Sequence, residues 1–355
     1  MTSQVELIGM TRDELRLFVS ELGERQFRGD QLFSWIHEHA VVDLDEMTNL
    51  PKEFRSQLRL SAEMDIPEIV DMVPSTETSS RKFLFKLRDG LKIETVFIPE
   101  GKRKTVCLSS QVGCPLECKF CATAKMGLLR NLTAGEIVGQ LLAVRRETGE
   151  RITNIVFMGM GEPMLNYQNV LKAAYIIHDD DGMNISTRKI TISTVGIAKR
   201  IRQFTKEKHP FKLALSLNAT DETQRASLMP ITKKYSIKDC LEALKEYTDR
   251  SRKRVTLEYV LMSGTNDSPA DARRLASFMK KLNCKLNVIP YNPIVGEPFK
   301  RPTVHQLEKF ISNVTGGRSM VTVRWSQGKD INAACGQLYV ENVEKTVRNQ
   351  TVVSA

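Results

Sequence analysis

The first 63 residues carry the hydrophobic pattern of short amphipathic helices. Thr11-Arg-Asp-Glu14 has the form of a capping box, in which the threonine and the glutamate satisfy each other's backbone amides at the start of a helix. Apolar residues then recur at one-face helical spacing in three stretches: Leu15, Phe18, Val19 and Leu22; Leu32, Trp35 and Ile36; Phe54 and Leu58. Gly23 stops the first helix and Pro51 opens the third. We therefore predict a small helical accessory domain over residues 1–63.

Between residues 64 and 103 the pattern changes from helical spacing to alternation. Asp89-Gly90 is a tight-turn signal between two alternating runs. The apolar members of these runs are Phe83, Phe85 and Leu87 before the turn, and Leu91, Ile93 and Phe97 after it. This pattern predicts a β-hairpin extension over residues 64–103.

From Thr105 onward, β-rich runs alternate with amphipathic helical segments. The β-rich runs end near Ser110, Met158, Ser193, Ser216, Met262, Pro290 and Arg324. One of the helical segments, residues 133–148, opens with a second capping box, Thr133-Ala-Gly-Glu136. Repeated βα units form parallel sheets, and about six of them favour an open barrel whose chemistry lies at the carboxyl ends of the strands. We predict an α/β fold with a partial (βα)6 barrel over residues 104–343 and a C-terminal tail over 344–355.

Composition and charge narrow the class of protein. The chain has 355 residues, 41% of them hydrophobic, and no apolar run reaches the roughly 20 residues that span a bilayer. The N-terminus lacks the basic-then-apolar order of a secretory signal, so we expect a cytoplasmic protein without membrane contact. The formal net charge of +10 favours a polyanionic partner such as RNA, although solvated surface charge also accounts for it. The basic pairs and triplets are Lys102-Arg-Lys104, Arg145-Arg146 and Lys233-Lys234.

Four of the seven cysteines fall within fifteen residues, a clustering that favours metal or catalytic chemistry over a disulfide framework. Cys114-Pro-Leu-Glu-Cys118-Lys-Phe-Cys121 is a CxxxCxxC motif. Three thiolates on one loop after a strand can ligate three irons of a 4Fe–4S cluster and leave the fourth iron open. S-adenosylmethionine (SAM) can chelate the open iron through its amino and carboxylate groups, and reductive cleavage of its S–C5′ bond then yields a 5′-deoxyadenosyl radical.

The competing interpretation of these cysteines is a structural zinc site. Such a site needs four ligands, usually in paired CxxC or Cys/His sets. The nearest other thiol, Cys107, precedes the motif by seven residues within a strand, and no histidine occurs between His39 and His178. Phe120 could pack near a bound adenine or fill the loop's core.

A glycine-rich turn follows the second predicted barrel strand, Phe157-Met-Gly-Met-Gly-Glu-Pro163. Glycine permits close backbone approach to a ligand, and the Glu162 carboxylate could accept a hydrogen bond from the amino group of bound SAM. Ser193, Ser216 and Asn292 close later strands and could bind ribose hydroxyls or the SAM carboxylate, or could simply cap those strands.

Four ordered motifs resemble one family over nearly the whole chain. They are Val106-Cys-Leu-Ser-Ser-Gln-Val-Gly-Cys114, the CxxxCxxC, Met158-Gly-Met-Gly-Glu-Pro163 and Ala333-Ala-Cys-Gly-Gln-Leu338, together with the N-terminal stretch Gln26-Phe-Arg-Gly-Asp-Gln-Leu-Phe-Ser-Trp-Ile36. The chain is similar to the radical SAM dual-specificity 23S rRNA and tRNA adenine carbon-2 methyltransferases. The resemblance implies a radical SAM barrel and methylation of one adenosine in 23S rRNA and one next to the anticodon in tRNAs. It also implies a 4Fe–4S cluster, two SAM per turnover, an electron donor such as flavodoxin or ferredoxin, a monomer, and an RNA-binding role for residues 1–63.

The resemblance further implies roles for two cysteines outside the motif, which on pattern alone could be buried small hydrophobes. Cys335 accepts a methyl group from one SAM, and a radical made from a second SAM turns that group into a methylene that bonds to carbon 2. Cys107 resolves this protein–RNA crosslink through a transient disulfide with Cys335. Glu94 matches the family's proton acceptor, although its position also suits an exposed strand carboxylate.

By the same resemblance, the SAM-binding positions are Gly161, Glu162, Ser193, Ser216, Leu217, Asn218 and Asn292. The family commonly has histidine where this chain has Asn218; asparagine also donates and accepts hydrogen bonds, so binding is expected to persist.

Other functions stay open on the sequence alone. The nearest is methylation of adenine at carbon 8, which confers antibiotic resistance and uses the same cysteines. A metal-stabilised RNA-binding protein and a radical SAM enzyme for a small molecule are the other two. The sequence marks neither the residues that extrude and read the target base, nor the preference between rRNA and tRNA, nor the identity of the electron donor.

Overall fold

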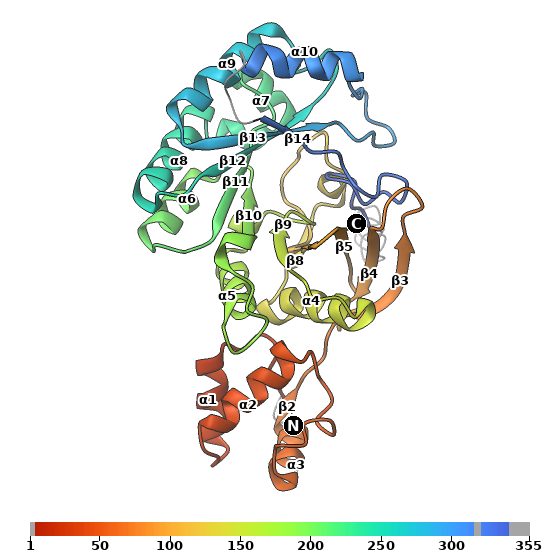
Figure 1. Ribbon diagram of the computed structural model, residues 1–355, viewed down its shortest axis with the longest axis vertical. Coiled ribbons are helices and arrows are strands. Elements are labelled where there is room, and N and C mark those ends of the chain that lie inside the picture. Colours follow the sequence, from red (N-terminus) through yellow and green to blue (C-terminus); the bar gives the residue numbers. More distant parts are fainter. Residues whose placement is uncertain (1–3, 316–320, 341–355) are drawn as a thin grey trace, which may run out of the picture.

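The computed structural model describes residues 4–315 and 321–340. At its centre lies a curved ten-stranded sheet in the order β14-β13-β12-β11-β10-β9-β6-β5-β4-β3 (Figure 1). The seven strands from β14 to β6 run parallel to one another. They are β6 (Arg103–Cys107), β9 (Asn154–Phe157), β10 (Ile190–Thr194), β11 (Lys212–Ser216), β12 (Val255–Leu261), β13 (Cys284–Pro290) and β14 (Val321–Val323).

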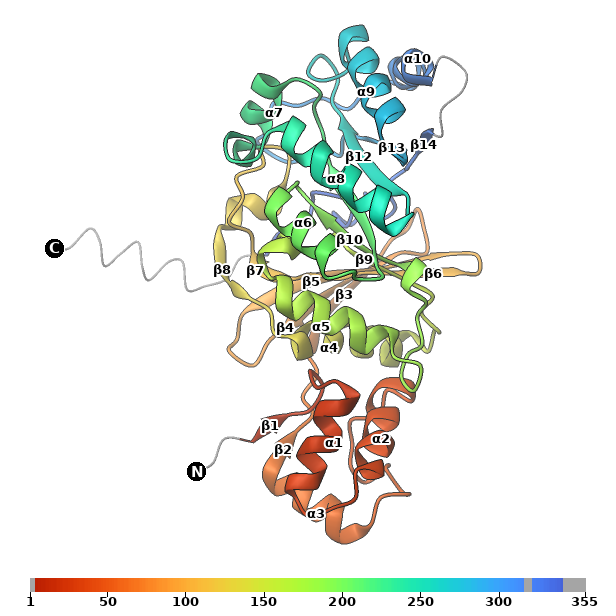
Figure 2. The same ribbon diagram turned by 90° about the vertical axis from the view of Figure 1, so that its left-hand side faces the viewer.

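Helices between these strands cover the outer face of the sheet (Figures 1 and 2). They are α4 (Ala134–Thr148), α5 (Tyr167–His178), α6 (Ala198–Lys206), α7 (Glu222–Leu228), α8 (Ile237–Ser251), α9 (Pro269–Lys281) and α10 (Val304–Thr315). The predicted capping box opens α4, where the Thr133 hydroxyl accepts from the Glu136 amide. Six strand–helix units followed by β14 confirm the predicted partial barrel.

The predicted hairpin is β4 (Arg81–Lys86) with β5 (Lys92–Glu100). The pattern missed two features around it. One is β3 (Glu68–Pro74), an edge strand whose mixed apolar and polar residues hide its period. The other is that β5 pairs antiparallel with β6, so the hairpin continues the barrel sheet.

The first barrel strand ends at Cys107 rather than near Ser110 as predicted. The chain beyond it leaves the sheet, because β7 (Gln111–Gly113) pairs instead with β8 (Leu128–Asn131). Gly113 has φ +77°, and a Cβ there would lie 1.8 Å from the Gly127 carbonyl oxygen. This two-stranded ribbon flanks the loop that carries the CxxxCxxC motif.

The N-terminal unit contains α1 (Arg12–Glu21), α2 (Phe27–Phe33) and α3 (Lys52–Ser61), with β1 (Val5–Glu6) paired to β2 (Ala62–Glu63). The capping box at Thr11 is present, as predicted. Trp35 and Ile36, which the pattern assigned to the second α-helix, lie instead in a π-helical turn, Ser34–Glu38. A π turn has the same apolar face as the end of an α-helix, so the pattern does not separate the two.

Helix α4 holds this N-terminal unit against the barrel (Figures 1 and 2). The Arg145 guanidinium donates to the carbonyl oxygens of His37 and Glu38 at 2.7 and 2.8 Å. Arg146 donates to the Ala40 carbonyl oxygen at 3.0 Å. The basic pair 145–146, an RNA candidate on sequence alone, thus satisfies backbone carbonyls at an internal contact.

None of the helices within residues 4–315 and 321–340 has the length and apolar character needed to cross a bilayer. The predicted C-terminal tail, 344–355, lies outside the described residues.

Candidate active site

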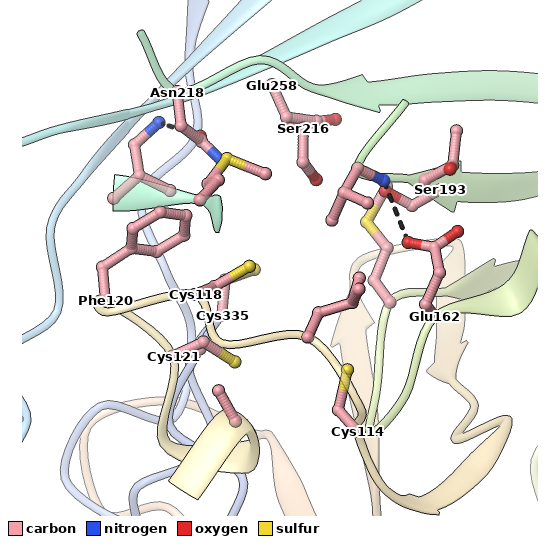
Figure 3. Close-up of a pocket in the computed structure, with 18 of the residues that line it drawn as sticks. Cys114, Cys118, Phe120, Cys121, Glu162, Ser193, Ser216, Asn218, Glu258 and Cys335 are labelled. Atoms are coloured by element: carbon pink, nitrogen blue, oxygen red, sulfur yellow. Dashed lines mark hydrogen bonds between the residues drawn. The ribbon is translucent and has the colours of Figure 1, made fainter. Parts of the chain in front are cut away.

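The three cysteines of the motif lie on one loop at the carboxyl-end rim of the barrel (Figure 3). The loop is fixed by backbone hydrogen bonds. The Cys114 amide donates to Gly127 O at 2.9 Å, and the Ala122 amide donates to Gly336 O at 2.7 Å. The thiols of Cys114, Cys118 and Cys121 line a single pocket.

Three thiols around one pocket form a donor set that fits a 4Fe–4S cluster. Among the described residues, no group of three or more His, Cys, Asp or Glu side chains is disposed to hold one metal ion. The three thiols instead lie around the wall of a pocket. Burial raises the pKa of Cys114 to about 12 and that of Cys121 above its ordinary value, so both thiols are neutral until a metal replaces their protons.

The predicted SAM-binding residues of three neighbouring strands meet in the same pocket. Gly161 and Glu162 follow β9, Ser193 lies near the end of β10, and Ser216 ends β11. Gly161 has φ +97°, and a Cβ there would lie 2.6 Å from the side chain of Gln111. Only glycine therefore fits this turn between the cluster ribbon and β9.

Glu162 points into the pocket and is held by two backbone amides (Figure 3). Its carboxylate accepts from Met164 N at 3.0 Å and from Val195 N at 2.9 Å. Burial nevertheless raises its pKa to about 7. A cationic group in the pocket would offset that cost, which suits Glu162 to an ammonium ligand.

The other three predicted SAM-binding residues differ in their placement. Asn218 lines the pocket, has φ +57°, and accepts from Val260 N at 2.9 Å. Leu217 is fully buried in the core, so its side chain faces away from the pocket. Asn292 is absent from the pocket wall, and its amide donates to Ser326 Oγ and to Cys335 O.

Two buried charged residues of the site escaped the sequence analysis. Arg225 of α7 donates to the carbonyls of Val195, Ser216 and Leu217 and so ties strand ends together. Glu258 is a buried carboxylate within the apolar strand β12 and lines the pocket. A single acidic residue in Val-Thr-Leu-Glu-Tyr-Val-Leu was a usable signal for Glu258, whereas an arginine on a short helix carries none.

Cys335 lies where this pocket meets a second cavity. Cys335 and Arg324 line both, and Cys107 of β6 lines the second. Burial, together with the nearby Cys335 thiol, raises the pKa of Cys107 to about 12. The structure thus brings together the two cysteines that the sequence separates by 228 positions.

Glu94 lies apart from both cavities. It is 4% exposed on β5, and its carboxylate pairs with Lys82 Nζ at 2.8 Å. The other oxygen accepts from the Tyr339 amide at 2.9 Å. Burial raises the pKa of Glu94, and Lys82 opposes that shift. The alternative interpretation from the sequence, that Glu94 is an exposed strand carboxylate, is therefore wrong.

Comparison with known proteins agrees with this geometry. Residues 5–64 match the family model of the ribosomal RNA large subunit methyltransferase N-terminal domain, and residues 108–276 match that of the radical SAM superfamily. A dual-specificity RNA methyltransferase RlmN of Lawsonia intracellularis (strain PHE/MN1-00) is 43% identical over 94% of this chain and 96% of its own length. That of Marinobacter nauticus (strain ATCC 700491 / DSM 11845 / VT8) is 40% identical over 99% of this chain and 97% of its own length.

The fold agrees as well. The crystal structure of a radical SAM methyltransferase from Sphaerobacter thermophilus superposes with a TM-score of 0.91 at 41% identity, covering 95% of this chain and 100% of that one. Radical SAM enzymes use a 4Fe–4S cluster and SAM, for which this chain has the thiols and the pocket. The chain therefore belongs to the radical SAM superfamily and, within it, to the dual-specificity RNA methyltransferase family RlmN.

Proposed function

We propose that this chain methylates carbon 2 of one adenosine in 23S rRNA and of the adenosine next to the anticodon in tRNAs. The observation that carries the proposal is the position of Cys335 between two cavities. One holds the cluster cysteines and Glu162, and the other holds Cys107. The dual-specificity name of the relatives favours this proposal over the carbon-8 alternative. We further propose that the enzyme acts in the cytoplasm as a monomer, with flavodoxin or ferredoxin as electron donor.

The residues that would hold the cofactors are those around the first pocket. Cys114, Cys118 and Cys121 ligate the cluster, and Glu162 receives the SAM amino group. The other proposed SAM-binding residues that line the pocket are Gly161, Ser193, Ser216 and Asn218. Leu217 would contribute its backbone, and Asn292, which lies outside the pocket wall, would act through its bond to Cys335 O. When bound, the cluster and SAM supply a methyl group and the capacity to abstract a hydrogen atom.

The two cysteines outside the motif carry the chemistry on carbon. The Cys335 sulfur accepts the methyl group, and its carbon, once a hydrogen atom has been removed, bonds to carbon 2 of adenine. The adduct gives up its odd electron, which the cluster could accept when bound, and the hydrogen of carbon 2 leaves as a proton. Cys107 then loses its thiol proton and attacks the Cys335 sulfur. An S–S bond forms, the S–C bond breaks with its electron pair on the methylene carbon, and that carbon takes up a proton and leaves on the base as the new methyl group.

Glu94 is the proposed proton acceptor in this series of reaction steps. It lies on β5, whose Val96 pairs directly with Cys107 on β6. Its raised pKa suits a group that takes and returns a proton. We also propose that residues 1–63 bind RNA, because residues 5–64 match a domain of ribosomal RNA methyltransferases.

Nucleoside mass spectrometry of a 23S rRNA fragment and a tRNA tests the proposal, after incubation with reconstituted enzyme, SAM and reductant. We expect 2-methyladenosine in both RNAs, and none with Cys335→Ala. Cys284→Ala is the matched control, since Cys284 lies at the start of β13 and lines neither cavity. A product of 8-methyladenosine alone, or unmodified RNA, contradicts the proposal.

A further inference from the structure

Trp325 lies at the rim of the second cavity, in the segment that follows β14. Its side chain is 48% exposed, whereas Cys107, deeper in the same cavity, is 8% exposed. A tryptophan with about half its surface in water leaves apolar area uncovered, and this one lines the same cavity as Cys107 and Cys335. Nothing in the proposed chemistry uses it.

Two cationic side chains lie near this ring. The Lys329 ammonium lies 5.8 Å and the Arg301 guanidinium carbon 6.0 Å from the ring centroid. The charged side chains in the wall of the cavity are Arg103, Lys285, Arg324 and Glu100, an excess of positive charge. An aromatic face among cations is how proteins bind single-stranded nucleic acid: the bases stack on the ring and the phosphates face the cations.

The ring is also coupled to the reactive segment. Arg301, which lies over Trp325, donates to the Asn292 side-chain oxygen at 3.1 Å. The Asn292 amide in turn donates to Ser326 Oγ at 2.9 Å and to Cys335 O at 3.2 Å. Contacts made at Trp325 therefore reach the Cys335 backbone through two side chains.

We propose that Trp325 is a stacking platform for the nucleobase that neighbours the target adenine in the RNA strand. The inference rests on RNA as the substrate. The target base itself has to bond to Cys335 inside the cavity, so the exposed ring at the rim is left for the next base. Lys329 and Arg301 then lie beside the phosphate between the two nucleotides.

Tryptophan fluorescence tests the stacking without cofactors or turnover. The chain has two tryptophans, so Trp35→Phe leaves Trp325 as the sole indole. The probes are an RNA hairpin with adenosine in its loop and the same hairpin with an abasic nucleotide next to that adenosine. We expect the first probe to quench Trp325 and the abasic probe to bind with little quenching. Equal quenching by both probes, or none by either, overturns the proposal.

Kinetics with the intact hairpin give the second test. Trp325→Ala is expected to raise KM for RNA about tenfold with kcat retained, and Trp325→Phe to stay within a few-fold of the wild type. Val304→Ala is the control, because Val304 is 60% exposed on α10 and lines neither cavity. An unchanged KM in Trp325→Ala overturns the platform but leaves RNA methylation intact. Failure of the wild type to modify RNA contradicts the proposed function instead, and the quenching result still decides on the platform.

Discussion

The Glu94 carboxylate accepts a hydrogen bond from the backbone amide of Tyr339 at 2.9 Å. This bond joins β5 to the segment that carries Cys335. Other bonds hold the same segment. Among them, Thr123 Oγ1 donates to Leu338 O at 2.7 Å, and the Thr76 amide donates to Asp330 Oδ2 at 2.7 Å. Glu94 therefore fixes the reactive segment, in addition to its proposed role with protons.

Removal of the carboxylate should loosen that segment. Because a hydrogen bond to a charged group contributes about 1.5–3 kcal/mol, Glu94→Ala should speed hydrogen exchange of the Tyr339 amide by at least tenfold. Glu94→Gln keeps an acceptor oxygen and should show a smaller increase. Glu100→Ala, at the exposed end of the same strand, is the control and should leave the exchange unchanged. Exchange in Glu94→Ala at the wild-type rate would contradict the role.

Cys107→Ala should stop the reaction after the crosslink has formed. Without the second sulfur no disulfide can release the base, so protein and RNA should stay covalently joined. Denaturing gels with labelled RNA measure the adduct, which we expect to accumulate to about one per active enzyme. Free methylated RNA at the wild-type rate from this variant would refute the resolving role of Cys107.

Gly161→Ala should weaken SAM binding. The added Cβ would meet Gln111 at 2.6 Å in a backbone conformation with φ +97°, so the turn around Glu162 has to move. Gly149→Ala is matched for a left-handed backbone, with φ +66°, but meets nothing within 4 Å at the end of α4. Isothermal titration with SAM is expected to separate the two variants, with at least a tenfold weaker affinity for Gly161→Ala alone. Equal SAM affinities of the two variants would mean that the turn accommodates the added Cβ, and would contradict the prediction.

His37 should make stability depend on pH. It is fully buried beside Arg145, and burial lowers its pKa to about 3. The unfolded chain binds this proton near pH 6.5 whereas the folded chain does not, so stability falls as pH falls below that value. From pH 7 to pH 5 the wild type should lose about 2 kcal/mol more than His37→Leu in urea denaturation. His39→Leu leaves His37 in place and should keep the wild-type dependence; parallel curves for the wild type and His37→Leu would contradict the assignment.

Arg145→Ala should weaken the seating of the N-terminal unit on α4. The variant leaves the carbonyls of His37 and Glu38 without their donor, at a cost of about 1–3 kcal/mol. Limited proteolysis near residue 64 should become faster, while exposed Arg151→Ala should behave as the wild type. Arg145→Lys keeps the charge but lacks the planar guanidinium that donates to both carbonyls. Its proteolysis rate should therefore lie between those of Arg145→Ala and the wild type.

Periodicity and capping boxes predicted most of the fold, because they depend on neighbours within one turn of chain. Strand β3 was missed because an edge strand exposes mixed residues on both faces. The π turn at Ser34–Glu38 was missed because its apolar face matches that of an α-helical end, and the Arg145 guanidinium that donates to Glu38 O lies 107 positions away. The pairing of β5 with β6 was missed because the pattern within each strand does not say which other strand lies beside it.

The candidate site divides in the same way. Cys114, Cys118 and Cys121 could be recognised from their spacing along the chain. Gly161 could be recognised because its turn needs a backbone conformation that favours glycine. Glu258 left a usable signal in its apolar strand, whereas Arg225 and Trp325 are recognised only from their positions in the structure. Glu94 was named by resemblance, and its contacts with Lys82 and Tyr339 could not be read from the strand pattern.

The bonds that fix the Cys335 segment also make the site late to assemble during synthesis. Thr76–Asp330, Glu94–Tyr339 and Thr123–Leu338 join residues 254, 245 and 215 positions apart. A ribosome-bound chain that has folded its first barrel units can already present the three cluster cysteines, but it still lacks Cys335. The cluster loop is made first, but its bond from Ala122 N to Gly336 O can form only after the segment that carries Cys335 has been made. The last strand–helix unit and the segment beyond it must therefore be made before the two cavities can share their wall at Cys335.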